Sequence, residues 1–336
     1  MATPAQPRAG TAPAEAVERA VRLLEAGELV GLPTETVYGL AADAGNDAAV
    51  RAIYAVKGRP ADHPVIVHLH RAADPLRWAA ELPRAARRLI ETCWPGPLTL
   101  VLPRRDGVAG VCAAGQDTIA LRSPDHALAQ AVLERLHGGH GGLAAPSANR
   151  FGRISPTCAA DVRDELGDAV AMVLDGGACT VGIESTIVDC SGPGTPRILR
   201  PGGLAADVLA QILGIEPRQL LAPRAAAAPR VPGQVASHYA PRTPLRLRPR
   251  AAIDAEWLRE GARVGVVAAR PAPPQAPAAW LAHWLALPAD PAGYARRLYG
   301  ALRALDARGL RQIWVEPVPD EPQWDALRDR LRRAAA

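Results

Sequence analysis

Apolar residues recur along the chain in two spacings, and these spacings separate predicted helices from predicted strands. Between residues 14 and 26, Val17, Val21 and Leu24 recur every three or four positions, which predicts an amphipathic helix. Short apolar runs bounded by Gly, Pro or polar residues follow, as is typical of buried strands. These runs occupy residues 29–32, 64–70, 98–102, 118–122, 143–145 and 182–190. The first part of the chain is therefore predicted to fold as an α/β domain.

A change of pattern near residue 216 predicts a second domain. Residues 216–232 are rich in Ala, Pro and Arg and show no periodicity, which is typical of a linker. Beyond it, apolar runs alternate with helical patterns, so a small parallel α/β domain is expected. The predicted segments are a disordered N-terminus at 1–13, a first domain at 14–215, a linker at 216–243 and a second domain at 244–336.

Composition narrows the class of protein only a little. A net charge of +5 permits contact with nucleotides or nucleic acid without requiring it. The five cysteines form no C-x-x-C pair, so we expect buried thiols of a reducing cytosol and assign no metal ligands. The chain lacks a Walker phosphate loop, and no apolar run reaches the roughly 18 residues of a membrane span. A cytoplasmic protein without membrane contact is expected.

Lys57 is the only lysine in the 336 residues, and every other Lys or Arg position is arginine. A compact ammonium can contact one phosphate or carboxylate oxygen in a narrow space where the flat arginine fork does not fit. Gly58 and Pro60 should end the helix before it, so Lys57 and Arg59 are expected at the surface of a cleft, converging on one anion. The alternative is that one lysine survived by chance. If Lys57 lies at a surface, replacing it with alanine should leave the fold intact.

Polar side chains on predicted strands supply further candidates. Thr34 and Thr36 are two positions apart, so in an extended backbone both hydroxyls face the same way, although such pairs are common in strands. Thr118 and Arg122 share one strand face. His68 also lies on a strand, where a histidine is usually a satisfied core or edge residue.

A Gly-containing loop carries another group of polar residues. Ser147, Asn149 and Ser155 precede a predicted helix at 158–166, a position suited to binding an anion through backbone amides. Because that helix needs an N-cap, either Ser155 or Thr157 is expected to have a structural role. Ser123 is likewise expected to cap the helix that follows it.

Six segments, taken in their order and spacing, resemble the threonylcarbamoyl-AMP synthases. They are residues 31–40 (GLPTETVYGL), 57–60 (KGRP), 64–68 (PVIVH), 118–122 (TIALR), 146–149 (PSAN) and 184–189 (ESTIVD). The His-Tyr-Ala-Pro stretch at 238–241 and the trailing domain resemble the long, two-domain form of that family. The resemblance implies a YrdC-like twisted mixed sheet with flanking helices, followed by a smaller C-terminal Rossmann-like parallel α/β domain.

The resemblance also implies a reaction. L-Threonine, bicarbonate and ATP would give threonylcarbamoyl-AMP and pyrophosphate, and a downstream tRNA threonylcarbamoyl transferase would use the product to form N6-threonylcarbamoyladenosine. The chain would thus be a nucleotidyltransferase. Mg²⁺ is expected with the ATP phosphates, without a protein carboxylate that we can name, and no tightly bound organic cofactor is expected.

By position, the resemblance assigns residues to both substrates. The L-threonine-binding groups fall on Thr34, Thr36, His68, Arg122, Ser185 and Thr186. The ATP-binding groups fall on Lys57, Arg59, His63, Thr118, Ser147, Asn149, Ser155, Arg200, His238 and Tyr239, with the last two in an active-site lid carried by the linker. Lys57 and Arg59 are also given the catalytic role, because attack of a carbamate on the α-phosphorus gathers negative charge that cations can stabilise.

A rival interpretation comes from a different class of protein. A non-catalytic RNA-binding module of the same fold would explain the many arginines but not the threonine and serine groups. Weak RNA binding is compatible with either interpretation. For the enzyme, removal of everything beyond about residue 215 is expected to leave a folded first domain with impaired turnover.

Overall fold

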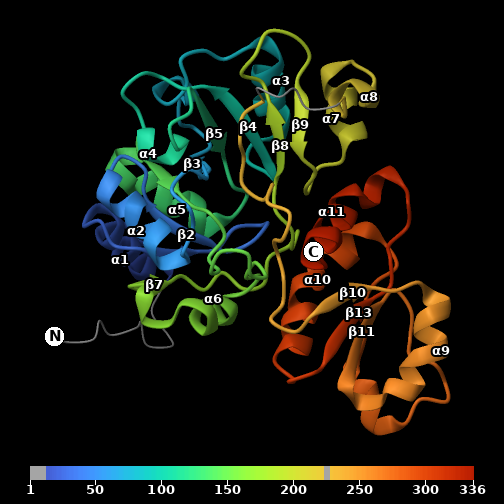
Figure 1. Cartoon of the computed structure of the whole chain (residues 1–336). Coiled ribbons are helices and arrows are strands. Elements are labelled where there is room, and N and C mark those ends of the chain that lie inside the picture. Colours follow the sequence, from blue (N-terminus) through green and yellow to red (C-terminus); the bar gives the residue numbers. More distant parts are fainter. Residues whose placement is uncertain (1–12, 223–227) are drawn as a thin grey trace.

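The computed structural model describes residues 13–222 and 228–336, which form two α/β bodies lying side by side (Figure 1). The first body contains a nine-stranded mixed sheet in the order β7-β1-β2-β6-β3-β5-β4-β8-β9. The second contains a four-stranded sheet, β10-β13-β11-β12, in which every neighbouring pair is parallel. The predicted fold class is therefore confirmed. The N-terminal segment expected to be disordered lies outside the described residues, apart from Pro13.

The elements of the first body alternate between helices and strands along most of its length. They are α1 (Pro13–Glu25), β1 (Val30–Leu32), β2 (Gly39–Asp43), α2 (Asp47–Lys57), β3 (Val67–Leu69), α3 (Arg84–Cys93), β4 (Leu98–Pro103), α4 (Gly110–Ala113), β5 (Thr118–Arg122), α5 (Ala127–Arg135), β6 (Gly142–Ala144), α6 (Ala159–Leu166), β7 (Met172–Val173), β8 (Thr186–Asp189), β9 (Arg197–Arg200), α7 (Ala206–Leu213) and α8 (Pro217–Leu220).

The second body is smaller. It consists of β10 (Leu245–Leu247), α9 (Arg250–Glu260), β11 (Val264–Ala268), β12 (Trp284–Ala286), α10 (Pro291–Asp306), β13 (Gln312–Val315) and α11 (Asp325–Ala334). No helix in the described ranges is both long and apolar enough to cross a lipid bilayer.

Helix α2 shows how local sequence positions a candidate residue. The Asn46 side chain accepts hydrogen bonds from the backbone N–H groups of Ala48 and Ala49, which caps the helix at its start. Gly58 ends the helix in the left-handed region, at φ 61°, where glycine carries no side-chain penalty. These two signals fix Lys57 at the last position of α2.

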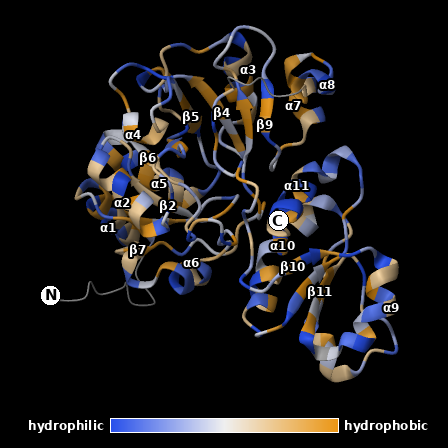
Figure 2. Ribbon diagram, viewed as in Figure 1, coloured by the Kyte–Doolittle hydropathy of each residue, from blue (hydrophilic) through white to orange (hydrophobic). Residues whose placement is uncertain are grey.

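Apolar side chains bury both faces of the large sheet and also join the two bodies. Orange, apolar positions concentrate in the strands, while the helices alternate between orange and blue (Figure 2). One cluster of buried residues combines Val37, Ile154 and Ile183 of the first body with residues of α10 and α11, including Leu298 and Leu327. The bodies therefore share a core in addition to having cores of their own.

Several expected boundaries differ from the structure. Helix α5 starts at Ala127 with His126 as its cap, because the Ser123 hydroxyl accepts a hydrogen bond from Gln130 instead. Helix α6 is capped at Cys158, whose backbone N–H donates to Asp161, and not by Ser155 or Thr157. The segment expected to be a linker contains α8 near its start.

Candidate functional site

A pocket that is partly open to solvent lies between the large sheet and the segment that joins the two bodies. Many of the predicted site residues line it. They are Thr34, Thr36, Arg59, His68, Arg122, Ser147, Ser185, Arg200, His238 and Tyr239. Six others do not line it, namely Lys57, His63, Thr118, Asn149, Ser155 and Thr186.

The two threonines lie side by side in a turn, not in an extended strand as expected. The Thr34 hydroxyl donates to the carbonyl of Val37 at 2.6 Å and accepts from the backbone N–H of Thr36 at 3.2 Å. This local bond closes the turn after β1. The two hydroxyl oxygens are 2.9 Å apart. The hydroxyls therefore face the same way as predicted, but a turn brings them together and not an extended backbone.

Arg122 ends β5 and is held on all sides. Its Nη1 donates to the Thr36 hydroxyl at 2.8 Å and its Nε to the carbonyl of Gly96 at 3.2 Å. Its Nη2 is 2.6 Å from a carboxylate oxygen of Glu35, which makes a buried ion pair although the angle is poor for a hydrogen bond. The guanidinium is thus already oriented toward the pocket by protein groups.

His68 faces Arg122 across the parallel pair of β3 and β5. Burial, together with the charge of Arg122, lowers the pKa of His68 to about 3. The imidazole is therefore neutral at physiological pH. Its Nδ1 is buried with no hydrogen-bond partner, which is the state expected of a group that contacts a ligand.

Lys57 and Arg59 are bonded to backbone carbonyls. The Lys57 ammonium donates to the carbonyls of Ser147 and Asn149, and Arg59 donates to those of His63 and Pro64. Lys57 is only 3 % exposed, so its expected place at the surface of a cleft is wrong. Burial lowers the pKa of Lys57 well below its usual value, and the charge of Arg59 acts in the same direction.

Arg200 joins the sheet to the segment that crosses the pocket. Its Nη2 donates to the carbonyl of Ser185 at 2.9 Å, and its Nη1 to the carbonyl of Pro232 at 3.1 Å. The Ser185 hydroxyl lies 2.7 Å from the hydroxyl of Thr99. The segment is therefore tied down before it reaches His238.

His238 and Tyr239 close one side of the pocket as part of a row of rings. Ring centroids are 5.8 Å apart between Phe151 and His238, 4.2 Å between His238 and Tyr239, and 5.9 Å between Tyr239 and Tyr299. The Nδ1 of His238 and the hydroxyl of Tyr239 are buried without partners. Gly233 makes the close approach possible, since a Cβ there would lie 2.3 Å from the Tyr239 hydroxyl.

The predicted residues away from the pocket have other contacts. His63 packs against Phe151, and Asn149 donates to the carbonyls of Arg150 and Arg153. Thr118 starts β5, at the end opposite Arg122. The Thr186 hydroxyl donates to the carbonyl of Leu204 at 2.6 Å. The Ser155 hydroxyl donates to a carboxylate oxygen of Glu184 at 2.6 Å.

Glu184 lines the pocket but was not among the predicted site residues. Burial by itself raises its pKa, but Arg330 and Arg200 outweigh that effect and hold the pKa at about 2. The sequence signal was a lone carboxylate at the start of a predicted buried strand. Its main partner is 146 residues away in the sequence, so this signal could not identify the role of Glu184.

Among the described residues, the side chains that line the pocket form no set of donors for a metal ion held by the protein. Of the carboxylates nearest to it, Glu35 is paired with Arg122 and Glu184 with Arg330. Within residues 13–222 and 228–336, no three His, Cys, Asp or Glu side chains converge to hold a metal ion.

Comparison with known proteins agrees with this architecture. A pocket at the edge of a YrdC-like mixed sheet, closed by a segment leading to a parallel α/β domain, defines the long, two-domain class of YrdC-like proteins. Residues 22–202 match the Sua5/YciO/YrdC family model, described as "Telomere recombination". Residues 205–336 match the model of the threonylcarbamoyl-AMP synthase C-terminal domain. The chain belongs to the threonylcarbamoyl-AMP synthase family.

Individual relatives match over almost the whole chain. The threonylcarbamoyl-AMP synthase of Pyrococcus abyssi is 34 % identical over 94 % of this chain and 93 % of its own length. That of Bacillus subtilis is 36 % identical over 95 % and 92 %. A crystal structure of P. abyssi Sua5 complexed with L-threonine has a TM-score of 0.82 at 33 % identity, covering 98 % of this chain and 96 % of the other.

Proposed function

We propose that this protein is an L-threonylcarbamoyladenylate synthase, a nucleotidyltransferase that converts L-threonine, bicarbonate and ATP to threonylcarbamoyl-AMP and pyrophosphate. The observation that carries the proposal is the pocket itself, which joins hydroxyls, a neutral imidazole and three guanidinium groups under one cover of aromatic rings. The product would serve a downstream tRNA threonylcarbamoyl transferase that forms N6-threonylcarbamoyladenosine, which places the enzyme in the cytoplasm.

The amino acid would bind on the side of Thr36, His68 and Arg122. A guanidinium suits a carboxylate, and the Thr36 hydroxyl suits the hydroxyl of threonine. Because His68 is neutral above a pKa of about 3, it can accept or donate a hydrogen bond without adding charge. Ser185 lies on the same wall, while Thr34 orients Thr36 through the turn.

ATP would bind on the side of Arg59, Ser147 and Arg200, beneath His238 and Tyr239. Attack of a threonine carbamate on the α-phosphorus brings anions together, so cations and positioning should supply most of the rate. Lys57 lies directly behind Ser147 and keeps its catalytic assignment with Arg59. Mg²⁺ would arrive as the counterion of ATP, bound chiefly through phosphate oxygens.

The test is pyrophosphate release by the purified full chain, measured with all three substrates and with each one omitted in turn. We expect release only when L-threonine, bicarbonate and ATP are all present, and little when L-serine replaces L-threonine. RNA binding without substrate-dependent pyrophosphate release would overturn the proposal in favour of a binding module.

A further inference from the structure

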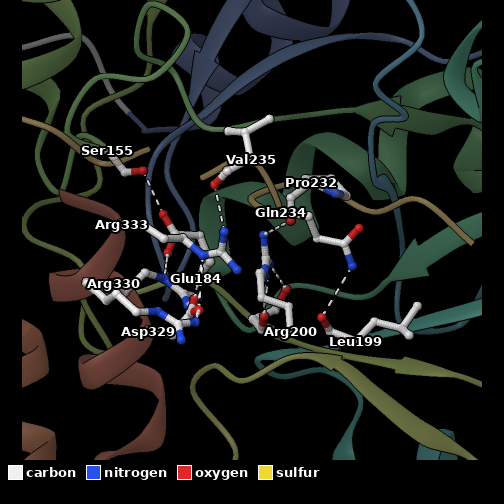
Figure 3. A network of polar contacts seen from close by, with 12 residues as sticks. Ser155, Glu184, Leu199, Arg200, Pro232, Gln234, Val235, Asp329, Arg330 and Arg333 are labelled. Carbon is white, nitrogen blue, oxygen red and sulfur yellow. Dashed lines mark hydrogen bonds and ion pairs between the residues drawn. The ribbon is translucent and has the colours of Figure 1, made fainter. Parts of the chain in front are cut away.

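The second body reaches the pocket of the first through a buried charge cluster. Arg330 of α11 lies 2.7 Å from Glu184, measured from its Nε to Oε2, and the hydroxyl of Tyr299 donates to the same oxygen at 3.0 Å. The other carboxylate oxygen accepts from Ser155 at 2.6 Å. Figure 3 shows the guanidinium of Arg330 and the hydroxyl of Ser155 converging on Glu184. Both oxygens of a pocket-lining carboxylate are thus held, one of them by the C-terminal body.

The same helix also holds the segment that covers the pocket. The guanidinium carbon of Arg330 lies 5.0 Å from the ring centre of Tyr239, which is cation–π distance. Arg333 of the same helix donates to the carbonyl of Val235 at 2.6 Å and accepts at its own carbonyl from the N–H of His238 at 3.1 Å. Asp329 pairs with both arginines at 3.0 Å. Helix α11 therefore contacts the covering segment from residue 235 to residue 239.

We propose that Arg330 is a positioning residue of the active site. By pairing with Glu184 and lying over the ring of Tyr239, it fixes His238 and Tyr239 above the pocket, so the site is complete only when the C-terminal body contributes it. The part of this inference that concerns turnover rests on the proposed function. The part that concerns the position of residues 231–241 does not.

Burial favours a role in positioning over a role in stability. Arg330 is fully buried, and removing two charges from water costs about as much as their attraction returns, so a buried ion pair adds little net stability. What it does add is directionality, since a guanidinium has a fixed fork of donors. Tyr239 needs such a constraint because its backbone lies in the left-handed region, at φ 63°, which is uncommon for a residue with a side chain.

The experiment compares two variants that keep the volume of the side chains. Replacing Arg330 alone leaves Glu184 as an unpaired buried charge and can unfold the protein. The informative variant is the double substitution Glu184→Gln with Arg330→Met, which removes both charges. The matched control is Arg270→Met, because Arg270 also pairs with a carboxylate and lies over an aromatic ring, within the second body. Its Nε lies 2.7 Å from Glu316, and its guanidinium lies 4.9 Å from the ring centre of Trp284. The Arg270 side chain is 16 % exposed and that of Glu316 is 21 % exposed, so Glu316 keeps contact with water when the arginine is replaced.

The primary readout is amide hydrogen exchange of residues 231–241 in the full chain without substrates. We expect exchange in this segment to become about tenfold faster in the double variant, with the strands of both sheets unchanged, and to stay as in the parent in Arg270→Met. Unchanged exchange in the double variant would overturn the proposal. So would faster exchange spread over the whole chain, or an equal effect in the control, since each indicates a general structural role.

Kinetics supply the second readout. We expect the turnover number for pyrophosphate release to fall about tenfold in the double variant, with a smaller change in the KM for L-threonine, because that amino acid would bind away from the covering segment. Arg330→Lys, with Glu184 intact, should recover part of the turnover. If the parent chain releases no pyrophosphate, the proposed function fails while the exchange experiment still decides the position of the segment.

Discussion

Lys57 lies at the end of α2 with its ammonium bonded to the carbonyls of Ser147 and Asn149, about ninety residues further along the chain. The bonds fasten the 146–149 loop to the helix. Arg59, Arg122 and Arg200 likewise donate to backbone carbonyls next to the pocket. Positive charge at this site therefore serves to hold loops in place as well as to attract anions.

This arrangement changes what replacing Lys57 should do. We expect Lys57→Met to lower the free energy of unfolding by about 2–4 kcal/mol, because two buried carbonyls lose a charged donor. Loss of activity is expected as well. The measurement is the denaturant midpoint, with Arg51→Met as the control, since Arg51 lies on the same helix with its side chain 64 % exposed. A Lys57→Met protein as stable as the Arg51 variant would refute the structural role and restore the earlier expectation of an intact fold.

The sequence was sufficient to predict those pocket residues whose position is set by local structure, such as a strand end or a short turn. Thr36 and Arg122 follow or end buried strands, and strands with short turns leave little freedom in where such side chains lie. It could not show that the cations bond to carbonyls, because that depends on how the 146–149 loop packs on α2. Nor could it show the pairing of Glu184 with Arg330, which requires the docking of the two bodies.

Helix α10 packs directly against the backbone of the first body. Gly182 has φ 82°, and a Cβ added there would lie 2.4 Å from the Cα of Arg296 in the helix. Arg296 also donates from its Nε to the carbonyl of Thr180 at 2.8 Å. A glycine at position 182 therefore sets how closely α10 approaches the segment before β8 that carries Glu184.

Gly182→Ala should separate this contact from backbone strain when it is compared with Gly177→Ala. Gly177 has a similar φ, 78°, but a Cβ there meets nothing within 4 Å. Both variants carry the cost of a left-handed alanine, about 1–2 kcal/mol. Gly182→Ala should lose a further 1–3 kcal/mol or so from overpacking against the helix. Thermal and denaturant midpoints test the difference. Equal losses of stability in the two variants would mean that α10 moves to accommodate the added methyl group without destabilising the protein.

At the scale of the whole molecule, the two bodies are joined by more than the covering segment. The shared apolar cluster, the pair of Arg153 with Asp306 at 3.2 Å and the pair of Arg303 with Glu165 at 3.3 Å all bridge them. Yet the first body also has a core of its own that extends to Leu220 in α8. A fragment should therefore end at residue 222 and not at 215, so that this part of the core is kept.

Such a fragment, residues 1–222, allows the contribution of the C-terminal body to be measured at one carboxylate. In the full chain, Glu184→Gln weakens the pair with Arg330 in a buried site, so we expect a loss of about 3–5 kcal/mol in the free energy of unfolding. In the fragment, Arg330 and Tyr299 are absent and water reaches the carboxylate, so the same substitution should change stability by less than about 0.5 kcal/mol. Both changes in the free energy of unfolding are measured by denaturant unfolding. The change in the full chain minus the change in the fragment is the coupling energy between the two bodies at this position. Equal effects in fragment and full chain would show that Glu184 is held by the first body alone, and the pairing across the two bodies would then carry no energetic weight.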